Sequence, residues 1–297
     1  MKPSLTGEEI VPPLKKARSE GRLSLVGLAW FGVLLLLCYA PVLGQLVSDW
    51  YNDEDMGHGF FVPVAAGYII WQRRKQWLDQ EFSTSVWGLV VVALGALQLI
   101  VATLGLELFL ARTAFLVSLA GAVLYLGGPR LLKLFLFPLF LLCFMIPIPA
   151  IVYNQITLPL QLFASRVAEF VLSTIGIPVL REGNILELSS QKLSVVEACS
   201  GIRSLLSLSF LALVYSYILD PKPWMRVALL VATVPIAIVA NAARVTVTGI
   251  VSEWNPALAQ NVFHLVEGWV VFLVAVMIMV GAHQFFNKVY ERMHAGR

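Results

Sequence analysis

Charged residues are scarce in this sequence of 297 residues: Asp, Glu, Lys and Arg make up 13% of it, whereas hydrophobic residues make up 59%. An average soluble domain holds about 25% charged residues and about 45–50% apolar residues. A soluble core built from a chain of this length does not have enough interior to hide so much apolar surface. The composition therefore excludes an ordinary soluble domain and indicates a protein that is surrounded by lipid.

Cysteine pairs and basic clusters are also missing, and each absence excludes a class of function. The three cysteines, Cys38, Cys143 and Cys199, form neither a disulfide framework nor a Cys-x-x-Cys pair. No cluster of His, Cys and carboxylate residues has the spacing of metal ligands, so we expect no metal and no cofactor. The net charge of +3 comes from basic residues scattered in short loops. Because nucleic acid calls for a continuous basic face, no nucleic-acid partner is expected.

Long apolar runs predict an all-α integral membrane protein with about eight transmembrane helices. A helix needs about 20 mostly apolar residues to cross a bilayer. The candidate spans are residues 23–43, 60–71, 86–104, 108–126, 131–148, 205–219, 224–248 and 262–286. The second is short unless residues 56–60 also lie in the membrane. The predicted domains are an N-terminal tail (1–22), a polytopic membrane domain (23–286) and a C-terminal tail (287–297).

Basic residues in the short loops predict that both termini are cytoplasmic. Lysine and arginine concentrate in the cytoplasmic loops of membrane proteins. With the N-terminus inside, the alternation of spans places these basic groups on the inner side: 15–22, 73–75, 130–133, 222–226 and 288–297. The acidic residues of segment 49–55 and Glu253 then fall outside.

Residues 153–180 are apolar but fit poorly as a further span. A span here would move Lys222 and Arg226 to the outside, and the segment carries Gln155, Gln161, Arg166 and Glu169. We therefore predict an amphipathic helix that lies on the outer face. The short alternating runs at 185–188 and 193–196 predict a small outer hairpin.

Segment Glu197–Ser204 contains the first candidate for chemistry. Cys199 would lie at the N-terminus of the sixth span, where the helix dipole favours the thiolate. Free backbone N–H groups at the same place could hold an oxyanion, and Gly201 would let a substrate backbone approach closely. The alternative is a buried membrane cysteine beside a helix cap, with Ser200 as the capping residue.

Two further candidates lie near the outer ends of the last two spans. Asn241 and Arg244 are three residues apart and share one helix face. An arginine in an apolar helix is costly and points to function, although its side chain could instead snorkel to the interface. His264 is the usual type of proton carrier near neutral pH, and a hydrogen-bonded structural role is its alternative. His58, at the outer start of the second span, is expected to support the site or to cap the helix.

The predicted topology was set by loop charges, yet it places Cys199, Arg244 and His264 on one side of the membrane at similar depth. A nucleophile, a cationic stabiliser and a proton carrier form a sufficient set for acyl transfer. Two other functions stay open. In a transporter or flippase for a polysaccharide or lipid-linked substrate, buried polar residues would line a path, but no inverted repeat or pair of broken helices is present. A non-catalytic scaffold would leave Cys199 unreactive to thiol reagents.

The motifs around these residues resemble those of the exosortase and archaeosortase family of membrane enzymes. They are E-A-C-S-G at 197–201, N-A-A-R at 241–244, His264, G-H-G-F-F-V-P at 57–63, W-Q-R-R at 71–74 and P-I-P at 147–149. The resemblance covers roughly Trp50 to Phe286. It implies that Cys199 is the nucleophile, His264 the acid/base and Arg244 the oxyanion or substrate anchor. The supporting residues would be Glu197, Ser200, Gly201, Asn241 and His58.

The resemblance also implies a substrate and a location. Family members are proposed to recognise proteins that end in a sorting tail, which consists of a Pro-Glu-Pro-like signature, one transmembrane helix and a basic cluster. They are proposed to cut near the signature, and in bacteria they accompany exopolysaccharide production. We therefore expect a cysteine transpeptidase or protease of the bacterial inner membrane, with a periplasmic active site and a thioester intermediate. Its expected partners are these protein substrates, an unknown acyl acceptor and membrane lipid.

Overall fold

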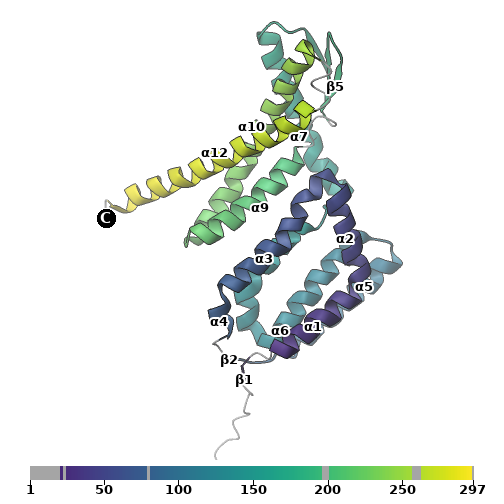
Figure 1. Cartoon of the computed structure of the whole chain (residues 1–297), viewed down its shortest axis with the longest axis vertical. Helices are drawn as coiled ribbons and strands as arrows, with labels where there is room; N and C mark the ends of the chain where they lie inside the picture. The colour runs from purple at the N-terminus through teal and green to yellow at the C-terminus, as the bar shows by residue number, and fades with distance from the viewer. Residues whose placement is uncertain (1–20, 23–24, 79–80, 196–200, 256–261, 296–297) are drawn as a thin grey trace, which may run out of the picture.

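The computed structural model describes residues 21–22, 25–78, 81–195, 201–255 and 262–295, and it is largely helical (Figure 1). In this described part, six helices are long and apolar enough to cross a membrane: α5 (Trp87–Leu104), α6 (Leu108–Leu141, continued to Met145), α7 (Ala150–Thr174), α9 (Ile202–Leu219), α10 (Pro223–Trp254) and α12 (Val262–Ala295). Helices α1 (Leu25–Cys38) and α2 (Ala40–Asn52) meet at 74° and form a seventh candidate if they are counted as one span. Large hydrophobic side chains are exposed along these helices, as lipid contact requires. The predicted all-α membrane fold is confirmed.

Two of the eight predicted spans, 108–126 and 131–148, correspond to the two halves of α6, which double back on each other: Arg112 in the first half binds Asp49, and Met145, just after the second half, accepts a hydrogen bond from Trp50. This helix bends at Gly128, which has a φ of +66° and is followed by Pro129. Before the bend, Gly121 packs against α5, and after it, Phe135 contacts Trp77 of α4 (Arg74–Leu78). Another predicted span corresponds to α3 (Phe61–Gln72), which has only 12 residues. The number of spans therefore stays a prediction.

The N-terminal helices pack through small residues. A Cβ atom added to Gly88 of α5 would lie 2.2 Å from the backbone nitrogen of Tyr125 in α6, so the two backbones approach very closely. Tyr39, at the break between α1 and α2, places its hydroxyl in the same seam, 2.8 Å from the Ser118 hydroxyl and 3.1 Å from the Ala114 carbonyl oxygen. These contacts hold the break between α1 and α2 against the α5–α6 pair, and the 3-10 helix η1 (Glu54–Phe60) follows α2.

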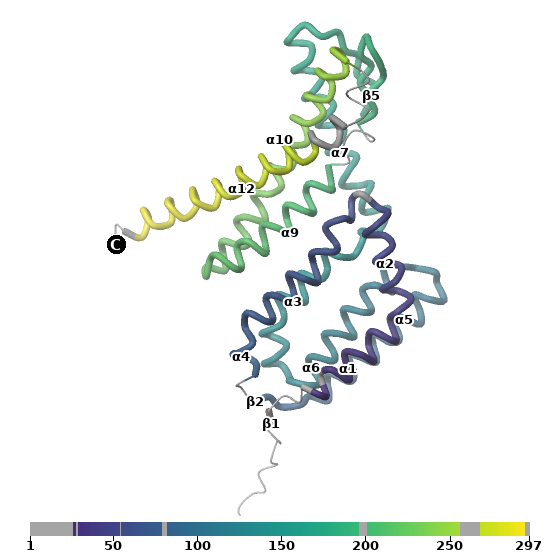
Figure 2. Tube along the Cα trace, viewed as in Figure 1, coloured from purple at the N-terminus to yellow at the C-terminus, as the bar shows by residue number. Residues whose placement is uncertain are grey.

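A small three-stranded sheet and α7 form a cap on one end of α10. The strands are β3 (Val179–Glu182), β4 (Ile185–Leu188) and β5 (Lys192–Ser194), in antiparallel order β3-β4-β5. The predicted hairpin is confirmed, because Ile185 pairs with Ser194 and Glu187 with Lys192. Figure 1 shows this cap beside one end of α10, away from α1, and the Cα trace in Figure 2 shows the same arrangement. Helix α7 is long and apolar enough to cross a membrane, so its placement on the outer face stays a prediction.

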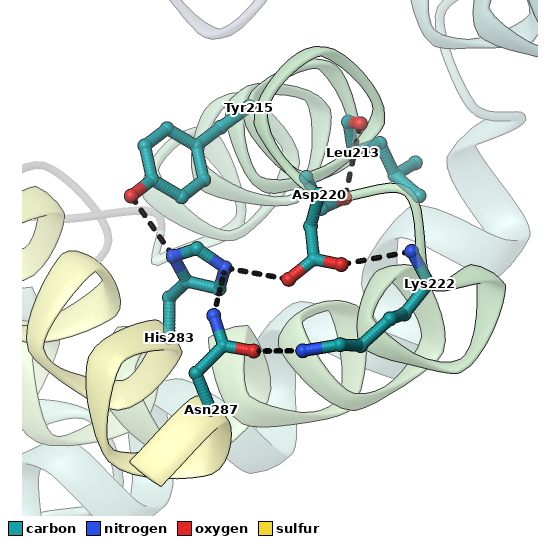
Figure 3. Close-up of polar contacts among 7 residues, drawn as sticks. Leu213, Tyr215, Asp220, Lys222, His283 and Asn287 are labelled. Carbon is teal, nitrogen blue, oxygen red and sulfur yellow. Dashed lines mark hydrogen bonds and ion pairs between the residues drawn. The ribbon is translucent and has the colours of Figure 1, made fainter. Parts of the chain in front are cut away.

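A polar cluster around His283 holds the other ends of α9, α10 and α12 together (Figure 3). The two ring nitrogens of His283 lie 3.1 Å from the Tyr215 hydroxyl and 3.1 Å from the Asp220 carboxylate. Asn287 lies 2.9 Å from the same histidine and accepts a hydrogen bond of 2.7 Å from Lys222. The cluster ties α12 to the loop between α9 and α10, far along the helix from His264.

The predicted inner and outer charges gather at opposite ends of the helices. Arg73 and Arg226, both predicted to be inner, lie over one tyrosine ring. At the other end, Asp49 accepts a hydrogen bond from Arg112 and Asp55 accepts one from Arg203. The separation agrees with the predicted alternation of loops. Which end faces the cytoplasm stays a prediction.

Candidate active site

Gly201 marks the point where the predicted nucleophile segment enters the described structure. It is the N-cap residue of α9, it is buried, and its φ of +69° lies in the left-handed region that favours glycine. Glu197, Cys199 and Ser200 lie outside the described residues, so their roles remain predictions. The helix dipole places a partial positive charge at this end of α9, directly after that segment.

Asn241 of α10 lies against the start of α9. A Cβ atom on Gly201 would be 3.1 Å from the amide nitrogen of Asn241 and 3.3 Å from its amide carbon. The asparagine is only 4% exposed. Because Gly201 has no side chain, the carboxamide can approach the N-terminus of α9. The structure thus brings together two of the predicted supporting residues from separate helices.

Arg244 lies one turn further along α10 and faces α12. A Cβ atom on Gly268 would be 3.5 Å from Nη2 of Arg244 and 3.6 Å from its Cζ. The arginine is 8% exposed, which argues against the alternative that it snorkels to the interface. Ala242 and Val245 on the adjacent side of α10 pack into the core formed with α7 and the sheet. This core fixes the rotation of α10, so that its polar pair is turned toward α9 and α12.

His264 is the third residue of α12, and its side chain is outside the described part. Position 264 is one turn before Gly268, and residues four apart share a helix face. Position 264 therefore lies on the face of α12 that meets Arg244. The predicted acid/base and the predicted anchor are on neighbouring helix surfaces.

An ion pair joins the start of α9 to the N-terminal helices. Nε of Arg203 donates to Oδ1 of Asp55 over 3.0 Å, and the hydroxyl of Tyr153 donates to Oδ2 over 2.7 Å. A cation in the first turn of a helix faces the positive end of the dipole, so Arg203 requires a carboxylate partner. From the sequence, Asp55 is predicted only as one of the outer charges. The unfavourable position of Arg203 in the first turn is the signal that could have revealed the link.

His58, three residues after Asp55, joins η1 to the 3-10 helix η2 (Leu142–Met145). Burial lowers the pKa of His58, so the ring is neutral near pH 7. Its Nε2 lies 3.1 Å from the carbonyl oxygen of Phe144 and, in the neutral tautomer that carries the proton there, donates to it. The neighbouring Trp50 covers Gly59 and donates from Nε1 to the Met145 carbonyl oxygen over 2.8 Å. These contacts make His58 part of the packing between η1 and η2, and its support of the site stays a prediction.

A narrow apolar cavity lies beside Gly201 and Asn241, between α7, α9 and α10. Its other lining residues are Leu160, Leu205, Val234, Ala237 and Ile238. The cavity gives the start of α9 a small apolar recess next to polar groups. Within the described ranges, no group of three or more His, Cys, Asp or Glu residues could hold a metal ion.

Comparison with known proteins identifies a family. The profile of the transmembrane exosortases (Exosortase_EpsH) matches residues 50–281 of the 297. The matched region begins at Trp50, includes η1 and α9, and extends beyond Gly268 into α12. A search of curated proteins and a search of solved structures each found no match.

The contact between Gly201 and Asn241 predicts that Gly201→Ala impairs both folding and substrate processing. Alanine in the left-handed region costs about 1–2 kcal/mol, and its Cβ would also push on Asn241. Gly183→Ala is the matched control, because Gly183 has a φ of +66° with nothing within 4 Å of an added Cβ. We expect both variants to lose thermal stability in detergent, Gly201→Ala the more of the two, and only Gly201→Ala to process substrate poorly. Normal processing by Gly201→Ala would show that this close approach is not required.

The link between Asp55 and Arg203 predicts strong coupling in a double-mutant cycle of Asp55→Asn and Arg203→Gln. The pair is partly buried, with side-chain exposures of 16% and 40%, so we expect a coupling energy of about 1–2 kcal/mol in the free energy of unfolding. Glu187 and Lys192 form the control pair: they have the same separation of 3.0 Å, but exposures of 39% and 68%. An exposed pair contributes about 0–1 kcal/mol. Equal coupling in the two cycles would contradict a special role for Asp55.

Proposed function

Because the chain belongs to the transmembrane exosortase family, we propose that it is a cysteine transpeptidase or protease that cleaves C-terminal sorting signals of exported proteins. Family membership supports a membrane enzyme that sorts proteins. The observation that carries the finer proposal is the buried pair Asn241 and Arg244, which faces the beginnings of α9 and α12. The beginning of α9 directly follows the predicted nucleophile, Cys199. The beginning of α12 carries the predicted acid/base, His264.

In the proposed reaction, the thiolate of Cys199 attacks the carbonyl carbon of the scissile peptide bond. A carbon–sulfur bond forms, and the carbonyl electron pair moves to oxygen to give a tetrahedral oxyanion. Cys199 is two residues before Gly201 in the chain, and the dipole at the start of α9 favours a thiolate there. The carbon–nitrogen bond then breaks and leaves a thioester on Cys199.

Arg244 and the first amides of α9 stabilise the oxyanion in this mechanism. A guanidinium placed where charge develops lowers the barrier without reorganising, provided that it is held in position. The core around Ala242 and Val245 supplies that rigidity for α10. Asn241 keeps the beginning of α9 close to the same face of α10.

His264 moves the protons. In the first step it gives a proton to the leaving amine, and in the second step it takes one from the incoming amine or water. The thioester carbonyl is then attacked, and the carbon–sulfur bond breaks to release Cys199. An amine acceptor gives transpeptidation, whereas water gives hydrolysis.

The substrate reaches this site from the lipid and from the outer face. We place the transmembrane helix of its tail between spans, with the Pro-Glu-Pro-like signature at the membrane surface near Gly201. The small apolar cavity between α7, α9 and α10 lies beside this position. The active site then faces the periplasm of a bacterial inner membrane, where exported proteins of exopolysaccharide-producing cells pass.

A transporter or flippase receives less support from the arrangement of polar groups. Arg244 and Asn241 lie in the second half of α10, and the cluster around His283 lies near its beginning. An apolar core separates them in the described part of α9, α10 and α12; its buried members are Leu208, Ala212, Met225, Leu229, Ala275 and Met279. A continuous polar path across the membrane would have to interrupt this core.

The mechanism predicts that Cys199→Ala abolishes tail removal from a model substrate with a Pro-Glu-Pro-type signature, because no thioester can form. The two proteins would be expressed together, and the substrate analysed by gel mobility and mass spectrometry. Cys38→Ala serves as the control, since that residue is exposed and lies at the end of α1. The mass of the new C-terminus identifies water or an amine as the acceptor. Tail removal at the normal rate by Cys199→Ala would contradict the proposal.

The proposed role of Arg244 predicts that Arg244→Lys lowers the processing rate by about 10²–10³-fold, as loss of one oxyanion donor does. Lysine keeps the charge but lacks the planar fork of the guanidinium. Arg181→Lys is the control, because Arg181 binds Glu169 in the cap through a hydrogen bond of 2.7 Å. Initial rates of product formation distinguish the two. Full activity of Arg244→Lys would remove Arg244 from the oxyanion site.

A further inference from the structure

Two arginines converge on one aromatic ring at the end of the helices opposite to Gly201. The Cζ atoms of Arg73 and Arg226 lie 4.7 Å and 4.4 Å from the centroid of the Tyr217 ring. Phe137 of α6 stacks on Tyr217, with ring centroids 3.8 Å apart and an interplanar angle of 2°. Arg73 follows α3, Tyr217 belongs to α9 and Arg226 to α10, so the cluster joins the N-terminal and C-terminal helices.

Neither of these arginines has an acidic partner in the described part of the chain, where no Asp or Glu forms an ion pair with them within 4.0 Å. Nε of Arg226 is buried and has no hydrogen-bond partner among those residues. By contrast, Arg112 and Arg203 at the other end each bind an aspartate. Two cations that share one ring repel each other in surroundings of low polarity. The arrangement therefore favours an anion that the described residues do not supply.

The surrounding side chains place this cluster at the level of lipid headgroups. Tryptophan, tyrosine and basic residues concentrate where a membrane meets water. Arg74 lies 4.3 Å above the ring of the exposed Trp71, and Lys222 lies 4.6 Å from the ring of Tyr290, which stacks on Trp224. Basic pockets between transmembrane helices at this depth are suited to lipid phosphates.

We propose that Arg73 and Arg226 bind the phosphate of an anionic phospholipid, with the stacked rings of Phe137 and Tyr217 as the floor of the site. The guanidinium fork matches phosphate oxygens and allows two parallel hydrogen bonds. The rings hold both cations by cation–π contact before the lipid binds. A bound phosphate neutralises the pair and connects the end of α3 to the start of α10. This binding does not depend on the catalytic proposal.

The test measures the unfolding temperature of the full-length protein in neutral detergent that contains either phosphatidylglycerol or phosphatidylcholine. A ligand that binds only the folded state raises this temperature. We expect phosphatidylglycerol to raise it on the order of 5 °C above phosphatidylcholine in the wild type, and to have little effect on Arg73→Gln or Arg226→Gln. Arg74→Gln is the matched control, because it removes an adjacent charge, whose guanidinium lies over the Trp71 ring and donates to the Trp71 carbonyl oxygen. This control should keep the full lipid effect.

Three outcomes would overturn the proposal. The first is an equal phosphatidylglycerol effect in the wild type, Arg73→Gln and Arg226→Gln. The second is an equal loss of the effect in Arg74→Gln, which would indicate general surface charge. The third is full stabilisation by millimolar inorganic phosphate without phosphatidylglycerol, which would assign the site to a free anion. If the glutamine variants do not fold, native mass spectrometry of the wild type decides: we expect retained phosphatidylglycerol adducts, and equal retention of phosphatidylcholine would reject the site.

Discussion

The cost of burying a charge among apolar helices shapes both ends of this molecule. Removing a charged side chain from water costs several kcal/mol, and a hydrogen-bonded partner is needed to offset the loss. The pairs Asp49–Arg112, Asp55–Arg203 and Asp220–His283 meet this need, and each joins elements that are distant in the sequence. Because these pairs lie at the helix ends, they act as ties between helices whose middle sections are apolar. The ion pairs that offset the cost of burying these charges therefore also fix the arrangement of the helices.

The candidate site depends on one ion pair, which acts on α9, and on one apolar core, which acts on α10. The Asp55 carboxylate holds the first turn of α9, and the core of α7 and the sheet sets the rotation of α10. Together they turn Asn241 toward Gly201 and Arg244 toward Gly268. A catalytic arginine is effective only if it is held before the reaction begins, since the protein then needs no reorganisation. The cap beside α10 thus holds this helix in its orientation, in addition to any contact with substrate.

The same reasoning explains why Arg73 and Arg226 are unusual. They lie over Tyr217 without a described acidic partner, whereas the arginines at the opposite end are paired. An anionic lipid would give these two arginines a negative partner as well, at the junction of α3, α9 and α10. Under this proposal, chemistry at one end of α9 and lipid binding at the other are separated by an apolar core.

Composition and periodicity by themselves determined that the chain is an all-α membrane protein, and the alternation at 185–188 and 193–196 determined the hairpin. Both follow from local rules, because lipid selects apolar helices and a strand repeats every second residue. The motif E-A-C-S-G and the pair Asn241 and Arg244 also indicated the correct family. Only the tertiary structure showed that Arg203 binds Asp55, that Gly201 leaves room for Asn241, and that two predicted spans join at Gly128. The choice of partner for a buried charge, and the space beside a glycine, depend on how segments far apart in the chain pack, and no local pattern contains that information.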